Sequence, residues 1–144
     1  DSIQAAVLDV KLTHFGEYTQ KRQWAATCYD SAFSSFQNYI TIPQRNPQST
    51  HVFHQYTIRL NECIDRDLLR EKLTKKGVPT MVYYPIPLHL QNAYKNNRHK
   101  EGDFPIAEGL CKTVLSLPMH TELSQEQLDY ITTLVVSLLK ECKK

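Results

Sequence analysis

His51-Val-Phe-His-Gln-Tyr-Thr-Ile-Arg-Leu60 is the stretch of sequence that decides the fold class. Valine, isoleucine, threonine, tyrosine and phenylalanine dominate it, and these residues favour strands. Successive strand side chains point to opposite faces of a sheet. A strand over 51–60 would therefore place one set of side chains on one face (Val52, His54, Tyr56, Ile58) and the other set on the opposite face (Phe53, Gln55, Thr57, Arg59).

The segment that follows this strand carries the signals of an amphipathic helix. Asp65 is a suitable N-cap, Gly77 is a suitable C-terminal stop, and leucines between them form an apolar face (Leu68, Leu69, Leu73). We expect a helix over 66–76 and a second strand over 78–84. A strand, a helix and a strand with short connections predict a compact βαβ-like unit.

The remaining sequence adds helices on both sides of this unit. Apolar residues at helical spacing predict a long helical region over 2–36, with Gly16 marking a kink or a break. Pro43 and Pro47 exclude a helix from the polar segment that follows. This pattern divides the chain into a long helical region, residues 1–36, and a region of mixed helices and strands, residues 37–144.

Three more elements are expected near the C-terminus. Pro105 suits the first turn of a short helix through Lys112, and a strand should follow over 113–118. Ser124 and Gln127 have the spacing of a capping box, and the last helix after them carries a buried face (Leu128, Ile131, Val135, Leu138, Leu139). The sequence therefore predicts an α+β fold, a small antiparallel-type sheet of about three strands with helices on one side.

Composition excludes several classes of partner. The chain has 144 residues and a formal net charge of +2, too small to indicate nucleic-acid binding. Its most apolar segment, Ile131 to Leu139, is too short to span a bilayer, and the opening residues Asp1-Ser-Ile-Gln4 do not predict a signal peptide, so no membrane partner is expected. Four widely spaced cysteines (Cys28, Cys63, Cys111, Cys142) indicate free, buried thiols in a reducing compartment, with the cytoplasm as the default location.

Common catalytic and metal-binding patterns find little support. His51 and His54 would point to opposite faces of a strand, so no metal site is expected. The four glycines are isolated, which excludes a glycine-rich phosphate loop, and no serine has the context of a nucleophile elbow. Cys111 is interpreted as a core residue, and Asp103 and Glu108 as carboxylates that charge the start of a helix.

Thr80-Met-Val-Tyr-Tyr-Pro-Ile-Pro-Leu-His-Leu-Gln91 is the one stretch that suggests a ligand. Pro85 and Pro87 end the expected strand, because neither ring nitrogen can donate to a sheet. The stiff turn would hold Tyr83, Tyr84 and His89 close together, and hydroxyl and imidazole groups suit a polar ligand such as a sugar. The alternative is that the tyrosines pack against the edge of the core and the histidine lies in solvent.

Several motifs of the chain, in this order, resemble one known family. The segments are Asp1-Ser-Ile-Gln-Ala-Ala-Val-Leu8 with Lys11-Leu12, His51-Val-Phe-His-Gln-Tyr56, Tyr84-Pro-Ile-Pro-Leu-His-Leu-Gln91, Gly102-Asp-Phe-Pro105 with Ala107-Glu108, and Leu115-Ser-Leu-Pro-Met-His120. They resemble the C-terminal part of the DegT/DnrJ/EryC1/StrS family of pyridoxal-phosphate-dependent nucleotide-sugar aminotransferases. The resemblance covers essentially the whole chain.

This resemblance implies a parent enzyme with an aspartate-aminotransferase-type fold (PLP fold type I). Residues 37–144 would be its small C-terminal domain, residues 1–36 would be the connecting helix region, and the large PLP-binding domain would lie outside this chain. The parent would be a cytoplasmic homodimer that transfers an amino group from an amino acid, commonly glutamate, to a keto-sugar nucleotide in amino-sugar or cell-surface polysaccharide biosynthesis. In the family, a lysine of the large domain forms a Schiff base with pyridoxal phosphate (PLP). No position of this chain matches that lysine, so the chain is expected to hold no catalytic residue and to bind no PLP alone.

What the resemblance assigns to the chain itself is a substrate-binding edge. Family members often read His-Tyr-Pro-x-Pro-x-His at this turn, and its first residues reach the sugar bound in the neighbouring subunit. Tyr84, Pro85, Pro87 and His89 match, whereas Tyr83 stands where many members have histidine. Tyr83, Tyr84 and His89 are therefore the expected substrate-binding residues.

Two alternative functions stay open at the level of sequence. A sister branch of the family uses pyridoxamine phosphate to dehydrate the sugar, with a histidine in place of the lysine. The second alternative belongs to another class, a freestanding sugar-binding module without catalytic activity.

Overall fold

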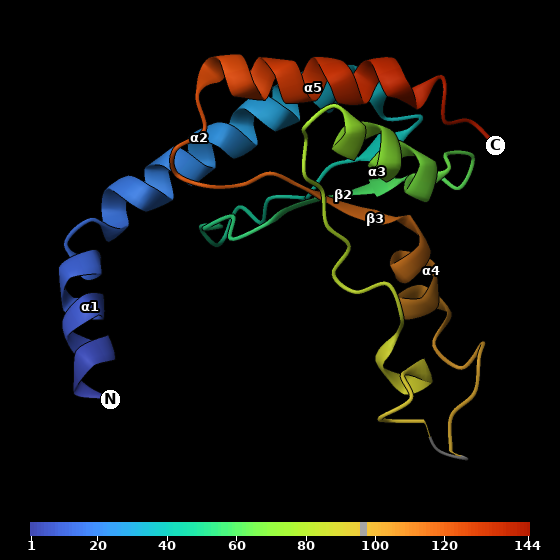
Figure 1. Ribbon diagram of the computed structural model, residues 1–144, viewed down its shortest axis with the longest axis horizontal. Helices are drawn as coiled ribbons and strands as arrows, with labels where there is room; N and C mark the ends of the chain where they lie inside the picture. The colour runs from blue at the N-terminus through green and yellow to red at the C-terminus, as the bar shows by residue number, and fades with distance from the viewer. Residues whose placement is uncertain (96–97) are drawn as a thin grey trace.

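The computed structural model describes residues 1–95 and 98–144 (Figure 1). In chain order, the elements are α1 (Ser2–Leu12), α2 (Phe15–Phe33), the 3₁₀ turn η1 (Ser34–Phe36), β1 (Ile40–Thr41), β2 (Tyr56–Leu60), α3 (Arg66–Lys75), the 3₁₀ turn η2 (Leu88–Leu90), α4 (Pro105–Thr113), β3 (Val114–Leu117) and α5 (Gln125–Leu139).

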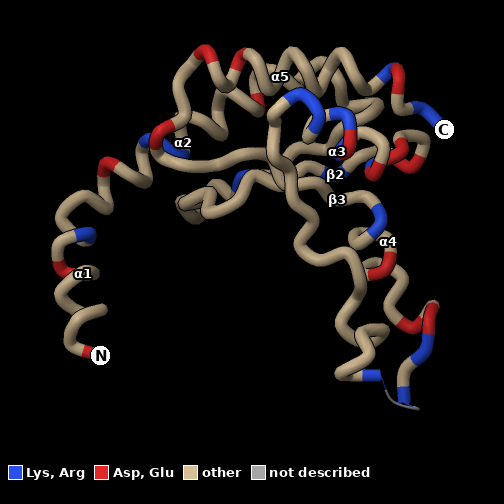
Figure 2. Tube along the Cα trace, in the orientation of Figure 1, with Lys and Arg blue, Asp and Glu red and all other residues tan. Residues whose placement is uncertain are grey.

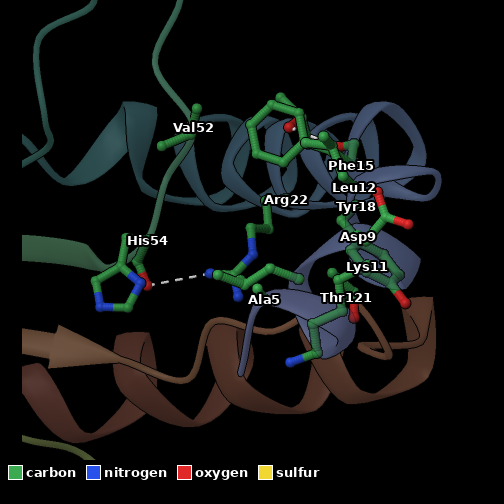
Figure 3. Close-up of a pocket in the computed structure, with 12 residues that line it drawn as sticks. Ala5, Asp9, Lys11, Leu12, Phe15, Tyr18, Arg22, Val52, His54 and Thr121 are labelled. Atoms are coloured by element: carbon green, nitrogen blue, oxygen red, sulfur yellow. Dashed lines mark hydrogen bonds between the residues drawn. The ribbon is translucent and has the colours of Figure 1, made fainter. Parts of the chain in front are cut away.

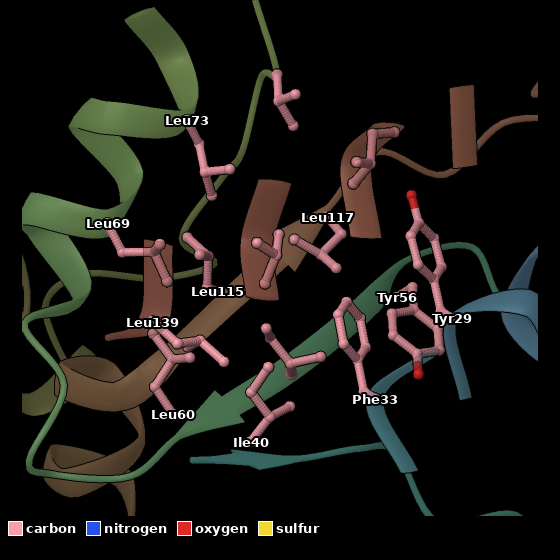
Figure 4. Close-up of a cluster of buried hydrophobic side chains, with 14 of the residues drawn as sticks. Tyr29, Phe33, Ile40, Tyr56, Leu60, Leu69, Leu73, Leu115, Leu117 and Leu139 are labelled. Carbon is pink, nitrogen blue, oxygen red and sulfur yellow. The ribbon is translucent and has the colours of Figure 1, made fainter. Parts of the chain in front are cut away.

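The strands form one antiparallel sheet in the order β1-β2-β3. Its register pairs Tyr56 with Leu117 and Ile58 with Leu115, so alternate residues of β2 and β3 face the same side. Helices α2, α3 and α5 lie over that side (Figure 1). The core between them contains side chains from every layer (Figure 4), including Tyr29, Phe33, Tyr56, Ile58, Leu69, Leu73, Leu115, Leu117 and Leu139. The predicted fold class is confirmed.

Strand β2 is shorter than the sequence predicts, because the regular alternation ends at Phe53. This residue has a φ of 47°, in the left-handed region, so its side chain does not follow the period of the strand. Phe53 is buried with its ring 6.2 Å from that of Tyr56, whereas Val52 is exposed. The prediction that Phe53 and Tyr56 lie on different faces of the strand was therefore wrong. Arg22 holds the irregular segment by donating to the carbonyl oxygens of Phe53 and His54, at 3.2 Å each.

The predicted strand over 78–84 is reduced to a single bridge. The Met81 amide donates to the Ser116 carbonyl at 3.0 Å, and the Ser116 amide donates to the Met81 carbonyl at 2.8 Å. Pro79 and Pro85 flank this bridge, and neither can extend the ladder. Because β2 and Met81 both run antiparallel to β3, they run parallel to each other with β3 between them. The βαβ-like unit is thus present in its chain path but lacks a full second strand, and its two strands are not adjacent.

The predicted helix ends agree closely with the structure. The Asp65 carboxylate accepts from the amides of Asp67 and Leu68 at the start of α3. Ser124 and Gln127 form both hydrogen bonds of a capping box at the start of α5. All five residues predicted for the buried face of the last helix are buried.

The N-terminal helical region is divided, with the break at residues 13–14 rather than at Gly16 itself. Helix α2 contributes Ala25, Ala26, Tyr29 and Phe33 to the core, whereas α1 buries no residue. Figure 1 shows α1 and the segment over 84–95 projecting from the same side of the body. Helix α1 therefore has an exposed surface for contacts outside this chain, whereas the 84–95 segment also contacts α4 through His89 and Glu108.

The four cysteines differ in exposure, which corrects the expectation that all are buried. Cys142 is buried, Cys28 and Cys111 are partly exposed, and Cys63 is exposed; all four are free thiols. Burial raises the pKa of Cys142 and of Cys28, so neither has the character of an activated nucleophile. Within the residues that the structure describes, no helix has both the length and the apolar character needed to cross a bilayer.

Candidate substrate-binding edge

The turn over 83–91 presents two tyrosines to solvent. Tyr83 is 43% exposed and Tyr84 69% exposed, and their ring centroids lie 6.1 Å apart at an interplanar angle of 80°. The peptide bond between them is cis. The turn is closed behind them, because Gln91 Nε2 donates to the Ile86 carbonyl at 3.1 Å and the Leu90 amide donates to that of Pro87 at 2.9 Å. The two rings therefore stand on a backbone that is held by its own hydrogen bonds.

The turn carries no formal charge. Figure 2 shows the segment from Thr80 to Tyr94 without a lysine, arginine, aspartate or glutamate. Ile86 and Leu88 are exposed beside the tyrosines. An uncharged surface of hydroxyl, aromatic and aliphatic groups suits a sugar ring better than a diphosphate, which cations and helix N-termini bind.

His89 lies apart from this exposed surface. Its side chain is only 9% exposed, its Nε2 atom lies 3.0 Å from Oε1 of Glu108, and its ring centroid lies 4.7 Å from that of Phe104. The structure thus exposes two of the three predicted substrate-binding residues and turns the third inward. The alternative, in which the tyrosines pack against the edge of the core and the histidine lies in solvent, does not describe this arrangement.

The sequence correctly placed Glu108 at the start of a helix but did not predict the hydrogen bonds that its carboxylate makes. It does lie in the first turn of α4, as expected, and its carboxylate accepts from the amides of Gly102 and Phe104 as well as contacting His89. Burial raises the pKa of Glu108, but the two amides and His89 outweigh burial, and the pKa falls below the usual value for glutamate. Asp103 instead accepts from the Lys100 amide and lies 3.7 Å from Nδ1 of His99.

A second feature, also missed from the sequence, is a groove of about 1010 Å³ beside α1 and α2. Figure 3 shows Arg22 reaching across it to the His54 carbonyl. Its lining is mainly apolar and includes Leu8, Leu12 and Phe15. His51 and His54 hold no metal cluster here: His51 Nδ1 accepts from the Phe53 amide, and the described residues contain no group of three metal-ligating side chains.

Comparison with known proteins decides the family. The sequence profile of the DegT/DnrJ/EryC1/StrS aminotransferase family matches residues 1–136. The chain belongs to this family. The resemblance stated from the sequence motifs is therefore confirmed, and so is the fold, since the solved structures it matches are aminotransferases of the DegT/DnrJ/EryC1/StrS type.

Relatives in the DegT/DnrJ/EryC1/StrS family extend well beyond this chain. The chain is 43% identical to a "pleiotropic regulatory protein" of Geobacillus stearothermophilus, over 91% of this chain and 35% of that protein. It is 35% identical to the dTDP-3-amino-3,4,6-trideoxy-alpha-D-glucose transaminase of Streptomyces venezuelae, over 88% of this chain and 32% of the relative. It is also 35% identical to the UDP-N-acetyl-3-dehydro-alpha-D-glucosamine 3-aminotransferase of Acidithiobacillus ferrooxidans, over 94% of this chain and 35% of that relative. The chain spans about a third of the length of these relatives.

Solved structures of the family give the same picture. The chain superimposes on S. venezuelae DesV, solved in complex with a ketimine intermediate, with a TM-score of 0.89 and 33% identity, over 97% of this chain and 37% of DesV. It superimposes on the PLP form of the sugar aminotransferase Spr1654 of Streptococcus pneumoniae with a TM-score of 0.84 and 28% identity, over 94% and 34%.

Proposed function

We propose that the complete protein containing this chain is a PLP-dependent aminotransferase that moves an amino group from an amino acid, glutamate in this proposal, to a keto-sugar nucleotide. The observation that carries the proposal is the family match over residues 1–136, with transaminases among the relatives that match most of the chain. Because those relatives are named transaminases, they favour amino transfer over dehydration of the sugar, the reaction of the sister branch. Under this proposal, the chain is the C-terminal domain and residues 1–36 connect it to a large domain.

The position of the keto group is part of the proposal. The S. venezuelae and A. ferrooxidans relatives are both named for sugars that carry the exchanged nitrogen on carbon 3. We take a 3-oxo hexose linked to a nucleoside diphosphate as the substrate class.

The residues of this chain fit a role in substrate binding but do not fit PLP. Every lysine that the structure describes is exposed or partly exposed, so none has the buried setting that lowers an amine pKa for covalent catalysis. The segment over 80–94, which contains the turn, also has no lysine or arginine to bind a phosphate group. PLP, which supplies the amino-transfer chemistry, is therefore assigned to the remainder of the enzyme.

Tyr83 and Tyr84 have the chemistry to orient the sugar. Each phenol can donate one hydrogen bond and accept others, and the rings offer apolar faces to the C–H groups of a pyranose. Correct orientation of a bound reactant can supply a large part of a rate enhancement without any bond-making by the orienting group. In this proposal the turn reaches the sugar bound by the partner subunit of a homodimer. A cytoplasmic location agrees with the four free thiols.

Amino transfer by the complete enzyme tests the proposed function. Nitrogen-15 glutamate is incubated with the PLP-loaded enzyme and with nucleotide sugars that carry the oxo group on carbon 3 or on carbon 4. We expect mass spectrometry to find one labelled amino group in the product of a 3-oxo sugar, with 2-oxoglutarate released in equal amount. Dehydration of the sugar without transfer of label would contradict the proposal.

The division of labour between the domains predicts a negative result for this chain alone. Mixing the 144-residue chain with PLP and reducing with borohydride should give no stoichiometric covalent adduct, because none of its lysines is buried in a setting that would favour one site. Intact mass and peptide mapping measure the result, and the complete enzyme is the positive control. A stoichiometric adduct at one specific lysine of this chain would show that the assignment of PLP to the other domain is wrong.

A further inference from the structure

The Glu108 carboxylate is the centre of a small polar cluster beside the turn. The Gly102 amide donates to both of its oxygens, at 2.9 and 3.0 Å, and the Phe104 amide donates to Oε1 at 3.3 Å. His89 Nε2 lies 3.0 Å from the same Oε1 atom. The side chains of His89 and Glu108 are only 9% and 11% exposed. A carboxylate with this number of donors acts as a junction between three segments of the chain.

The junction connects the substrate edge to the sheet. His89 belongs to η2, which is joined to the tyrosines by Pro85-Ile-Pro87, and Glu108 belongs to α4, which runs without a break into β3. The other end of α4 is also held, since Arg66 Nη1 on α3 donates to the Cys111 carbonyl at 3.0 Å. The contact between His89 of the 83–91 turn and Glu108 joins two side chains that are both nearly buried. It therefore attaches the turn to helix α4.

The geometry is poorly suited to direct contact between His89 and a ligand. An ionised carboxylate can only accept hydrogen bonds, so the proton shared with Glu108 is on Nε2 of His89. The ring is also covered by Phe104 at a centroid distance of 4.7 Å. The exposed polar groups of the turn are those of Tyr83 and Tyr84.

We propose that His89 and Glu108 are positioning residues that hold the turn against α4 and thereby place Tyr83 and Tyr84 for the substrate, with neither His89 nor Glu108 touching the sugar. The part of this inference that concerns the substrate rests on the proposed function. The part that concerns the junction is a property of the chain and can be tested without any substrate.

The junction should respond to pH with a definite sign. His89 from η2 is the titratable group in contact with Glu108, and the loop before α4 also carries His99 and Asp103, which lie 3.7 Å apart. The pKa of Glu108 is lowered in the folded chain, so its ionised contacts stabilise the fold above the pKa of an unfolded glutamate. That stabilisation is lost as the pH falls through the lowered pKa of the folded state.

Hydrogen exchange of the 144-residue chain, read at single amides by NMR, tests the junction. In Glu108→Gln and His89→Leu we expect exchange at the Gly102 and Phe104 amides to accelerate about tenfold or more, because each change removes a hydrogen bond to a charged group. His89→Gln keeps an N–H donor near the position of Nε2 and should restore most of the protection. If the exchange rates of these two amides are unchanged in both Glu108→Gln and His89→Leu, the inference that His89 and Glu108 hold the turn against α4 is wrong.

His99→Leu is the matched control. The His99 ring also contacts Phe104, at a centroid distance of 5.1 Å, and His99 has an acidic partner in Asp103 at 3.7 Å. Unlike His89 it is exposed, and the hydrogen bonds and ion pairs of Glu108 among the described residues do not include it. Its replacement should leave the Gly102 and Phe104 amides at wild-type rates. The amides of β2 report on the whole fold, and if Glu108→Gln loosens them too, the comparison of His89→Leu with His89→Gln decides the question.

A kinetic comparison in the complete enzyme separates positioning from ligand contact. Positioning predicts that Glu108→Gln and His89→Leu both raise KM for the sugar nucleotide about tenfold, that His89→Gln recovers, and that KM for glutamate is unchanged. A rise in His89→Leu without one in Glu108→Gln would make His89 a ligand and overturn the inference. Absence of amino transfer from the wild-type enzyme would instead contradict the proposed function and leave the exchange result standing.

Discussion

Replacement of Phe33 by alanine is expected to lower the free energy of unfolding of the chain by about 3–5 kcal/mol. Phe33 is fully buried in α2, stacked on Tyr29 with a centroid distance of 6.1 Å, and it lies in the core between the helices and the sheet (Figure 4). Truncation removes the apolar transfer energy of the ring and leaves a cavity that rigid neighbours on α2 and β2 cannot fill. Urea unfolding followed by circular dichroism measures the change.

Phe15→Ala supplies the matched control for this measurement. Phe15 is the same residue type at the other end of the same helix, and it is 56% exposed in the groove beside α1. Its replacement should change the free energy of unfolding by less than about 0.5 kcal/mol. Equal effects at the two positions would mean that the N-terminal half of α2 is buried to the same extent as the C-terminal half, contrary to the structure.

Replacement of Tyr84 by alanine in the complete enzyme is expected to lower kcat/KM for the sugar nucleotide about 100-fold, with little effect on the reaction with glutamate. Tyr84 is the most exposed aromatic residue of the turn, so the loss would come from substrate contacts rather than from unfolding. Tyr84→Phe removes the hydroxyl alone and should cost about tenfold, which corresponds to roughly 1.4 kcal/mol for one hydrogen bond. Steady-state kinetics with each substrate varied separately measures both effects.

Tyr130→Phe is a suitable control for loss of a tyrosine hydroxyl. Tyr130 is also exposed, but it lies on α5 and its hydroxyl donates to the Lys76 carbonyl at 2.9 Å, on the helix-covered side of the molecule. Its replacement should leave kcat/KM for both substrates within about twofold of wild type. If Tyr84→Ala has no larger effect than Tyr130→Phe, the turn over 83–91 is not the substrate-binding edge.

The parts of the fold that local chemistry determines were predictable from the sequence. Asp65 and Ser124 are residues whose side chains cap a helix wherever the backbone permits, and both do so here. The alternation of Tyr56 and Ile58 with polar residues correctly placed β2, because a half-buried strand imposes a period of two. These features depend on neighbours in the sequence, and such neighbours can be read directly.

The parts that depend on distant residues were not predictable in the same way. The left-handed conformation of Phe53 is held by Arg22, which lies on a different element, and no local signal announces that contact. The expected strand over 78–84 has the right composition, but among residues 1–95 and 98–144 its one ladder partner is Ser116, and the prolines on both sides prevent more. Pattern alone does not say how much of an edge segment will pair.

The candidate site shows the same limit. The exposed Tyr83 and Tyr84 could be placed on a stiff turn because Pro85 follows them directly. That His89 is buried against Glu108 could not be foreseen, since the two residues lie 19 positions apart and Glu108 also has the signature of an ordinary first-turn carboxylate. A histidine and a glutamate on either side of a loop that ends in Gly102-Asp-Phe-Pro105 would be the signal to seek elsewhere.

The most direct test of the account is a crystal structure of the complete enzyme with its sugar nucleotide bound. The account predicts the hydroxyl of Tyr84 within hydrogen-bonding distance of a sugar hydroxyl, about 2.6–3.2 Å, with Nε2 of His89 still on the Glu108 carboxylate. A sugar bound away from the turn over 83–91, or held directly by His89 with the Glu108 contact broken, would contradict it.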